Sequence, residues 1–116
     1  MFPFLRRRVP EITVDELDDL MTAGQVHVVD VREDHEFRAG HVRGAIPVPL
    51  GELAHRHGSL PRDRRIAVIC QSGSRSLAVT EFLLTRGLDG AASVRGGTSA
   101  WARSGRPIER GSRRVA

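Results

Sequence analysis

Apolar and polar positions change along this chain in short blocks, and the pattern predicts strands and helices in alternation. Two runs, 26–31 and 66–70, are mostly apolar, which is typical of short strands buried on both faces. Two further strands are predicted at 45–49, where each proline disfavours helical backbone in the residue before it, and at 91–94. Five helices are predicted, each followed within two residues by a glycine: 14–22, 33–38, 52–57, 76–86 and 98–104.

This alternation indicates an α/β fold in which helices cover both faces of a mostly parallel sheet. The first helix carries its own start signal, because Thr13 and Glu16 have the spacing of a capping box. In open α/β sheets, functional groups gather beyond the carboxyl ends of the strands. Two strand ends stand out here, because Asp30 and Arg32 close the first apolar run and Cys70 closes the second.

Length and composition fit one domain that needs neither a metal nor a disulfide to fold. The chain has 116 residues, 40% of them apolar and 28% charged. Its single cysteine, Cys70, excludes an internal disulfide, and no apolar run approaches the roughly 20 residues of a membrane span. The apolar opening at 1–5 is too short for a secretory signal and has its arginines on the wrong side. We therefore expect a cytoplasmic protein without a membrane partner.

The net charge of +4 is concentrated at the two ends of the chain. Every cation is an arginine, three of them at 6–8 and five at 103–116. We predict an N-terminal extension at 1–10, a folded domain at 11–108 and an arginine-rich tail at 109–116. Basic ends can attract nucleic acid. Without interleaved aromatic residues or a nucleic-acid-binding motif, we interpret them as solvated ends and do not expect a nucleic-acid partner.

The segment Cys70-Gln71-Ser72-Gly73-Ser74-Arg75-Ser76 has the features of an anion-binding loop. It lies between the second apolar run and the longest predicted helix, so Cys70 faces unpaired N–H groups and the positive end of the helix dipole. Small residues at 72–74 let the loop curl with its amides inward, and Arg75 adds positive charge. These features favour the thiolate, which is the nucleophilic form of cysteine. The alternative, a small buried hydrophobe, leaves the loop and its arginine without a packing purpose.

This loop resembles the active-site loop of the rhodanese family. Two more motifs resemble that family's amino-terminal signature and its closing motif, in the expected order. They are Asp30-Val31-Arg32-Glu33 with Glu36-Phe37 and Gly40-His41-Val42-Arg43-Gly44-Ala45-Ile46, and then Gly96-Gly97 with Trp101. The resemblance covers roughly 11–108, nearly the whole chain, and it implies a rhodanese-like α/β fold.

The resemblance also implies sulfur transfer through a cysteine persulfide. Cys70 would attack the outer sulfur of a small anionic donor such as thiosulfate, and cyanide or a thiol would then accept the sulfur. The loop residues that would hold the anion are Gln71, Ser72, Gly73, Ser74 and Arg75. Neither a metal nor an organic cofactor is implied.

Two alternatives remain open. Phosphatase relatives of the rhodaneses place five residues between cysteine and arginine, whereas four separate Cys70 from Arg75. The shorter loop favours a sulfane sulfur over the phosphate of a cysteine-dependent phosphatase or the arsenate of an arsenate reductase. The second alternative is a sulfur-carrying or regulatory binding module that receives sulfur from a protein persulfide, and it needs Cys70 as well.

Other polar and glycine residues are expected to support the site. We interpret Asp30 and Arg32 as a pair that ties loops together, and His41 as a residue that fixes a turn. Bare backbone at Gly96 and Gly97 would allow a close approach to the pocket.

Three further expectations concern residues near the loop and on the third predicted helix. Ser76 is expected to cap the helix that follows the loop. Trp101 is expected to pack against the sheet. His55 and His57 point to different sides of their predicted helix, so no metal site is expected there.

Overall fold

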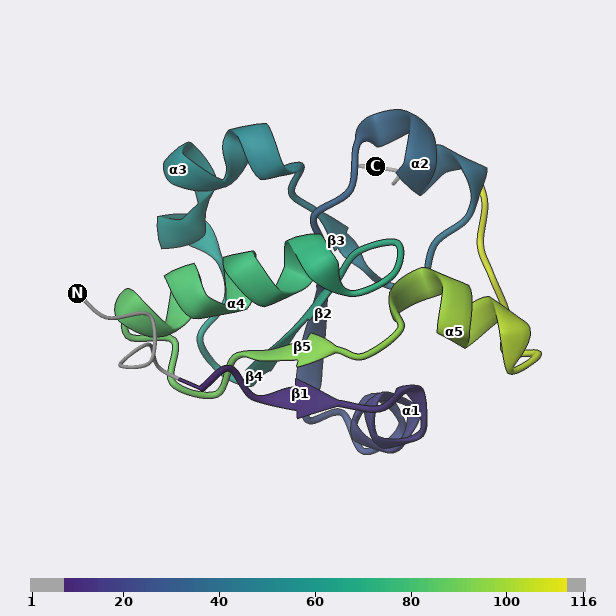
Figure 1. The fold of residues 1–116 in the computed structure, drawn as a ribbon, viewed down its shortest axis with the longest axis horizontal. Coiled ribbons are helices and arrows are strands. Elements are labelled where there is room, and N and C mark those ends of the chain that lie inside the picture. The colour runs from purple at the N-terminus through teal and green to yellow at the C-terminus, as the bar shows by residue number, and fades with distance from the viewer. Residues whose placement is uncertain (1–7, 113–116) are drawn as a thin grey trace.

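The computed structural model describes residues 8–112 and contains a five-stranded sheet in the order β1-β5-β4-β2-β3 (Figure 1). All four strand pairs are parallel, so the α/β class with a parallel sheet is confirmed. The strands are β1 Glu11–Ile12, β2 Val26–Asp30, β3 Ile46–Pro47, β4 Arg65–Ile69 and β5 Ala92–Val94. The helices are α1 Val14–Thr22, α2 Asp34–Ala39, α3 Leu53–Arg56, α4 Ser74–Thr85 and α5 Gly97–Arg103, with 3₁₀ turns at Leu50–Glu52 and His57–Ser59.

Helix starts follow local capping chemistry. α1 spans the predicted residues, and its capping box is present: the Glu16 N–H donates to Thr13 Oγ1 (3.1 Å) and the Thr13 N–H donates to Glu16 Oε1 (2.8 Å). α4 starts at Ser74, two residues before the predicted start, because Gly73 takes the N-cap position with left-handed backbone. The active-site loop is correspondingly shorter than the sequence suggested.

Strand β1 was not predicted. It has two residues, and only Ile12 is buried, so it carries no hydrophobic period that a sequence could display. It forms in the folded chain because β5 offers it an open edge, with Ile12 in register with Val94. It forms one edge of the sheet, next to β5 and opposite the edge formed by β3.

The alternation of side chains along β4 divides the core between the two faces of the sheet. Ile66, Val68 and Cys70 pack with residues of α3 and α4 on one face, and Ala67 and Ile69 pack on the other. Figure 1 shows α4 covering the first face and α1 below the second. This alternation places the Cys70 side chain on the face covered by α4.

The second face is closed by one large side chain from each of three helices. Leu17 of α1, Phe37 of α2 and Trp101 of α5 are all buried there. Trp101 is buried in one cluster with Ala67 and Ile69 of β4, which confirms that it packs against the sheet. Its indole N–H donates to the carbonyl of Pro107 (2.9 Å) and fixes the chain after α5. Among the described residues, no helix is long and apolar enough to cross a membrane.

The first residues of the expected tail lie along the domain. Glu109 and His41 exchange two backbone hydrogen bonds (2.8 and 2.9 Å), and the Gly111 N–H donates to the carbonyl of Arg38 (2.9 Å). Figure 1 shows this yellow segment rising from α5 toward α2. Residues 1–7 and 113–116, most of the expected extension and half of the expected tail, lie outside the described residues.

Candidate active site

Cys70 follows β4 directly, and its sulfur is surrounded by hydrogen-bond donors. The side chain is 1% exposed. The Gly73 N–H donates to Sγ at 3.1 Å and the Ser76 N–H donates at 3.3 Å. The Ser76 hydroxyl oxygen lies 3.4 Å from the same sulfur. A thiolate here would therefore be solvated by the protein in place of water.

These contacts outweigh the effect of burial on the thiol. Burial alone raises the pKa of Cys70, and it is the largest single influence. The Ser76 hydroxyl and the N–H groups of Ser76, Gly73 and Ser72 together lower the pKa further than burial raises it, so it lies below the ordinary value. The arrangement favours the nucleophilic form, as the sequence predicted.

Gly73 makes the curl of the loop possible. Its φ of +113° lies in a region that side-chain-bearing residues rarely adopt. A Cβ on Gly73 would also lie 3.4 Å from the backbone nitrogen of Gly96, so the loop passes close to the chain before α5. This conformation turns the Gly73 N–H back onto the Cys70 sulfur.

The expectation that Ser76 caps α4 is wrong. Ser76 lies in the first turn of the helix, after the N-cap at Gly73, and is fully buried. Its hydroxyl contacts the Cys70 sulfur, donates to the carbonyl of Gly73 (3.1 Å) and shares a hydrogen bond with Ser93 (2.8 Å). The hydroxyl thus faces the reactive atom, because two residues of the expected loop belong to the helix.

Ser72 and Ser74 do not share this position. Both are exposed, so their hydroxyls are available to solvent at the surface of the loop. Gln71 is partly buried, and its side chain bonds to Arg32 and Ser99. Within the predicted anion-holding set, the contacts to sulfur therefore come from backbone N–H groups.

Arg75 forms an ion pair that the sequence analysis did not anticipate. Its guanidinium donates to both carboxylate oxygens of Glu36, at 2.8 and 2.9 Å. The Arg75 hydrogen bonds lower the pKa of Glu36 to about 2. The positive charge expected beside Cys70 is present but is compensated by a carboxylate from α2.

Of the two glycines expected to approach the pocket, Gly97 lies closest to the loop backbone, and Gly96 lies closest to its own helix. A Cβ on Gly97 would lie 2.4 Å from the carbonyl oxygen of Cys70, and one on Gly96 would lie 2.6 Å from Ala100 Cβ. The room that these glycines leave lets α5 begin directly against the loop.

The first N–H groups of α5 donate hydrogen bonds to backbone carbonyls of the loop. The Thr98 N–H donates to the carbonyl of Cys70 (2.9 Å), and the Ser99 N–H donates to the carbonyl of Gln71 (3.0 Å). The Thr98 hydroxyl also donates to the Cys70 carbonyl (3.2 Å). The first N–H groups of a helix have no partners within the helix. In α5 the carbonyls of the loop accept from them, and these hydrogen bonds fix the position of the loop relative to α5.

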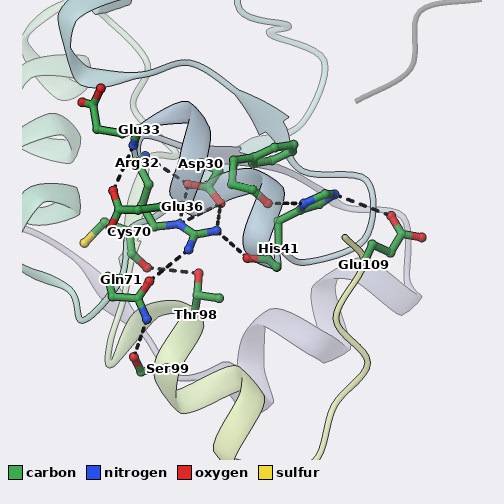
Figure 2. A network of polar contacts seen from close by, with 12 residues as sticks. Asp30, Arg32, Glu33, Glu36, His41, Cys70, Gln71, Thr98, Ser99 and Glu109 are labelled. Carbon is green, nitrogen blue, oxygen red and sulfur yellow. Dashed lines mark hydrogen bonds and ion pairs between the residues drawn. The ribbon is translucent and has the colours of Figure 1, made fainter. Parts of the chain in front are cut away.

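Asp30 and Arg32 form a buried pair, in line with the structural interpretation. Asp30 is completely buried and Arg32 is 3% exposed. The Arg32 guanidinium donates to both oxygens of Asp30, to the carbonyl of Gly40 (2.8 Å) and to Gln71 Oε1 (3.0 Å). Gln71 Nε2 in turn donates to Ser99 Oγ (2.8 Å). Figure 2 shows this chain of contacts running from the end of β2 through Gln71 to α5.

His41 fixes the turn after α2, as expected. Its ring stacks on Phe37 with 3.7 Å between centroids, and Nδ1 lies 2.8 Å from the Phe37 carbonyl oxygen. Nε2 points toward Glu109 at 3.9 Å, which is visible at the right of Figure 2. The imidazole thus joins α2 to the segment after α5 and does not contact the loop sulfur.

The described residues contain no group of three His, Cys, Asp or Glu side chains placed to bind a metal. His57 packs edge-on against Phe82, with ring centroids 5.2 Å apart. His55 is exposed on α3. The chemistry that the arrangement can perform is nucleophilic attack by a buried, amide-stabilised thiolate.

Comparisons with known proteins agree with this geometry. Residues 13–104 match the family described as the rhodanese-like domain. The thiosulfate sulfurtransferase GlpE of Shewanella oneidensis is 34% identical over 90 residues, which cover 78% of this chain and 89% of that protein. A sulfurtransferase of Allochromatium vinosum is 34% identical over 101 residues, which cover 86% and 94%. A solved rhodanese-related protein from Thermoplasma volcanium has a TM-score of 0.80 at 36% identity and covers 86% of this chain and 97% of its own.

The fold, the cysteine loop and these matches place the chain in the rhodanese-like family. The names of its relatives support a sulfurtransferase type of enzyme. The resemblance stated from the motifs is thereby confirmed.

Several residues that shape the site were missed by sequence reasoning. Glu36, Ser93, Thr98 and Ser99 reach the loop from other segments of the chain. Glu36 carried the only available signal, since it lies in the signature segment and has a capping-box spacing with Glu33. That spacing predicts a helix start and gives no indication of a contact with Arg75.

Proposed function

We propose that this protein transfers sulfane sulfur from thiosulfate to a thiophilic acceptor through a persulfide on Cys70. The observation that supports this proposal most directly is the set of N–H groups aimed at one buried sulfur, from Ser72, Gly73 and Ser76. Preorganised donors stabilise negative charge where it develops during reaction. Here they would stabilise the thiolate first and the persulfide anion afterwards.

The reaction has two displacement steps. The Cys70 thiolate attacks the outer sulfur of thiosulfate, a new S–S bond forms, and sulfite leaves with the electron pair of the broken S–S bond. Cyanide then attacks the terminal sulfur, and the Cys70 thiolate leaves as thiocyanate forms. A thiol acceptor first loses its proton to solvent and then attacks in the same way. Neither step requires a metal or an organic cofactor.

The residues around Cys70 have distinct parts in this proposal. Gly73 and Ser76 hold the anionic sulfur, and Gln71 keeps the loop attached to Arg32 and α5. Ser72 and Ser74 offer exposed hydroxyls to an incoming donor. Because the reaction needs a reduced thiol, we place the protein in the cytoplasm.

Mass spectrometry and turnover test the proposal together. Incubation with thiosulfate should add one sulfur atom, about 32 Da, and cyanide or a reducing thiol should remove it. Cys70→Ser should gain no sulfur, because a hydroxyl cannot hold a transferable sulfur. If the wild-type protein gains no sulfur from thiosulfate or from a protein persulfide, the proposal is wrong.

The same experiment distinguishes the two alternatives. A protein that takes sulfur from a protein persulfide but hardly turns over thiosulfate would be a carrier or regulatory module. Rapid hydrolysis of an aryl phosphate that is lost in Cys70→Ser would indicate a phosphatase. The four-residue spacing between Cys70 and Arg75 argues against that result.

A further inference from the structure

A groove of about 560 Å³ lies beside the active-site loop, between α2 and α5. Ala39 and Ala102 contribute to its two helical walls, and Ile108 and Arg110 contribute from the segment after α5. This volume is in the range of small-molecule sites and is larger than thiosulfate requires. The groove therefore has room for a carbon-containing ligand in addition to the sulfur donor.

The groove borders the reactive loop at Gln71. Gln71, the residue after Cys70, lines it, and so does Glu36, which holds Arg75. Ser99 lines it as well and is joined to Gln71 by a hydrogen bond of 2.8 Å. A ligand in the groove would thus lie beside Gln71, the residue that follows the reactive cysteine.

The charge of the groove is positive. Arg32 and Glu36 line it, but Asp30 compensates the first and Arg75 the second. Arg103 and Arg110 also line it, and neither has an ion-pair partner within residues 8–112. Two uncompensated guanidiniums at one groove match a ligand with carboxylates.

A favourable interaction with a helix dipole accounts for the presence of Arg103 but not of Arg110. Arg103 lies in the last turn of α5, where a cation interacts favourably with the helix dipole. Arg110 lies in no helix, yet its neighbours are fixed: Glu109 is bridged to His41, and the Gly111 N–H donates to Arg38. The segment expected to be a free tail thus holds Arg110 at the groove.

We propose that this groove binds the carboxylate-bearing part of a small acceptor thiol, which rests on the proposed sulfurtransferase function. The thiolate of the bound acceptor attacks the terminal sulfur of the Cys70 persulfide. A new S–S bond forms on the acceptor, and Cys70 leaves as the thiolate with the electron pair of the broken bond. The thiol proton has already passed to solvent.

Acceptor specificity tests this proposal, with rates compared at equal thiolate concentration. With thiosulfate as donor, mercaptosuccinate, which has two carboxylates, should have a kcat/KM up to roughly tenfold above that of neutral 2-mercaptoethanol, which is the upper range for two exposed charge pairs. The double variant Arg103→Gln with Arg110→Gln should lose this preference. A matched double variant, Arg62→Gln with Arg64→Gln, removes the same charge at the amino end of β4 and should keep it.

Cyanide as the acceptor distinguishes an effect on ligand binding in the groove from an effect on sulfur transfer itself. Because cyanide has no carboxylate, thiocyanate formation should stay within about twofold of wild type in both double variants, since isolated exposed charges contribute little elsewhere. If cyanide turnover is intact but mercaptosuccinate is not preferred, or if the Arg103/Arg110 variant keeps the preference, the groove proposal is wrong and the sulfurtransferase proposal stands. A loss of cyanide turnover in that variant would also overturn it, because the arginines would then act on the loop itself.

Binding alone tests the groove if no thiocyanate forms with the wild-type protein. The unreactive thioether 2-(methylthio)succinate should then shift the backbone amide resonances of Gln71, Ser99 and Ala102. The shifts should disappear in the Arg103/Arg110 variant and persist in the Arg62/Arg64 variant. Absence of shifts in the wild-type protein would contradict the proposal, whatever the outcome for sulfur transfer.

Discussion

The guanidinium of Arg75 and the carboxylate of Glu36 face each other in a two-point contact, at 2.8 and 2.9 Å, across 39 residues of sequence. Arg75 belongs to the first turn of α4 and Glu36 to α2, so the pair fastens the active-site loop to the helix beside it. The loop arginine is therefore a compensated charge, and stabilisation of the Cys70 sulfur falls to the Ser76 hydroxyl and to backbone N–H groups.

Removing either charge of this pair should change the use of thiosulfate in opposite directions. Glu36→Gln leaves Arg75 uncompensated and should lower the KM for the dianion, whereas Arg75→Ala leaves Glu36 uncompensated and should raise it. A factor of roughly three to ten is expected at low salt for one unit charge a few ångströms away, and it should shrink at high salt. Steady-state rates at two ionic strengths measure both effects.

Asp34→Asn provides the control for that measurement. It removes one negative charge from the same helix, where Asp34 pairs with Arg38 at an exposed position. Its KM should remain close to wild type. If Glu36→Gln and Arg75→Ala both raise the KM equally at high salt, the pair acts by holding the loop in place, and the electrostatic explanation is wrong.

The same pair predicts an acid-dependent contribution to stability. The folded-state pKa of Glu36 is about 2, against an ordinary value of 4.5, so the unfolded chain binds the proton more tightly. The stabilisation is complete above about pH 4.5 and is lost as the pH falls toward 2. Glu36→Gln should therefore lower the free energy of unfolding at neutral pH, by up to about 1 kcal/mol for a partly exposed pair. Denaturation at several pH values should show this difference narrowing below pH 4.5; a difference that is independent of pH would contradict the assignment.

Ser76 should control the ionisation of Cys70. Its hydroxyl is the strongest of the groups that lower the Cys70 pKa, and Ser76→Ala removes it while keeping the Ser76 N–H. The pH midpoint of alkylation by iodoacetamide should lie below the ordinary value near 9 in the wild-type protein and rise in Ser76→Ala. Ser72→Ala, at an exposed hydroxyl, should leave the midpoint unchanged. Equal midpoints in all three proteins would show that the Ser76 hydroxyl does not lower the Cys70 pKa, and the assignment would be wrong.

The features that could be predicted are those that depend on residues adjacent in the sequence. The capping box of α1, the apolar run of β4 and the glycine-containing turn at Gly73 are local patterns, and the structure contains all three. The thiolate-stabilising loop follows from them, because a strand that ends at a cysteine just before a helix start aims that helix's N–H groups at the sulfur.

What could not be predicted depends on segments brought together by the parallel sheet. The contact between Gln71 and Ser99 spans 28 residues, and β1 exists only because β5 has a free edge. The role of Ser76 was assigned wrongly because α4 starts two residues early, at Ser74, and because the partner that its hydroxyl meets, Ser93, lies on β5. Periodicity and residue type do not encode such distances.

Arg32 should contribute far more to stability than an exposed arginine nearby. Arg32→Ala would leave Asp30 fully buried without its partner, and such a loss typically costs about 3–5 kcal/mol. Arg43→Ala removes an exposed contact to Glu109 at 3.5 Å and should cost less than about 1 kcal/mol. Urea denaturation measures both. If Arg32→Ala costs no more than Arg43→Ala, the buried pair is not a major contributor to stability and this prediction is wrong.

Gly97 should be the glycine whose replacement damages the site most. Its φ is +59°, and a Cβ would lie 2.4 Å from the Cys70 carbonyl oxygen and 2.7 Å from backbone atoms of Gln71. Gly105 has a similar positive φ of +80°, but an added Cβ would meet nothing within 4 Å. Its replacement thus measures the cost of backbone strain without a steric clash. Gly105→Ala should therefore cost about 1–2 kcal/mol and leave sulfur transfer unchanged.

Gly97→Ala should cost at least about 2 kcal/mol more than Gly105→Ala, because the methyl group must displace the backbone on both sides of the Cys70–Gln71 bond. That displacement moves the carbonyls that accept from Thr98 and Ser99, so the loop loses its support from α5. Gly97→Ala protein that remains folded in the cold should consequently form the persulfide slowly, and the iodoacetamide midpoint of Cys70 should rise. If Gly97→Ala and Gly105→Ala are equally stable and equally active, α5 can retreat from the loop without consequence, and its N-terminus is not what holds the sulfur in place.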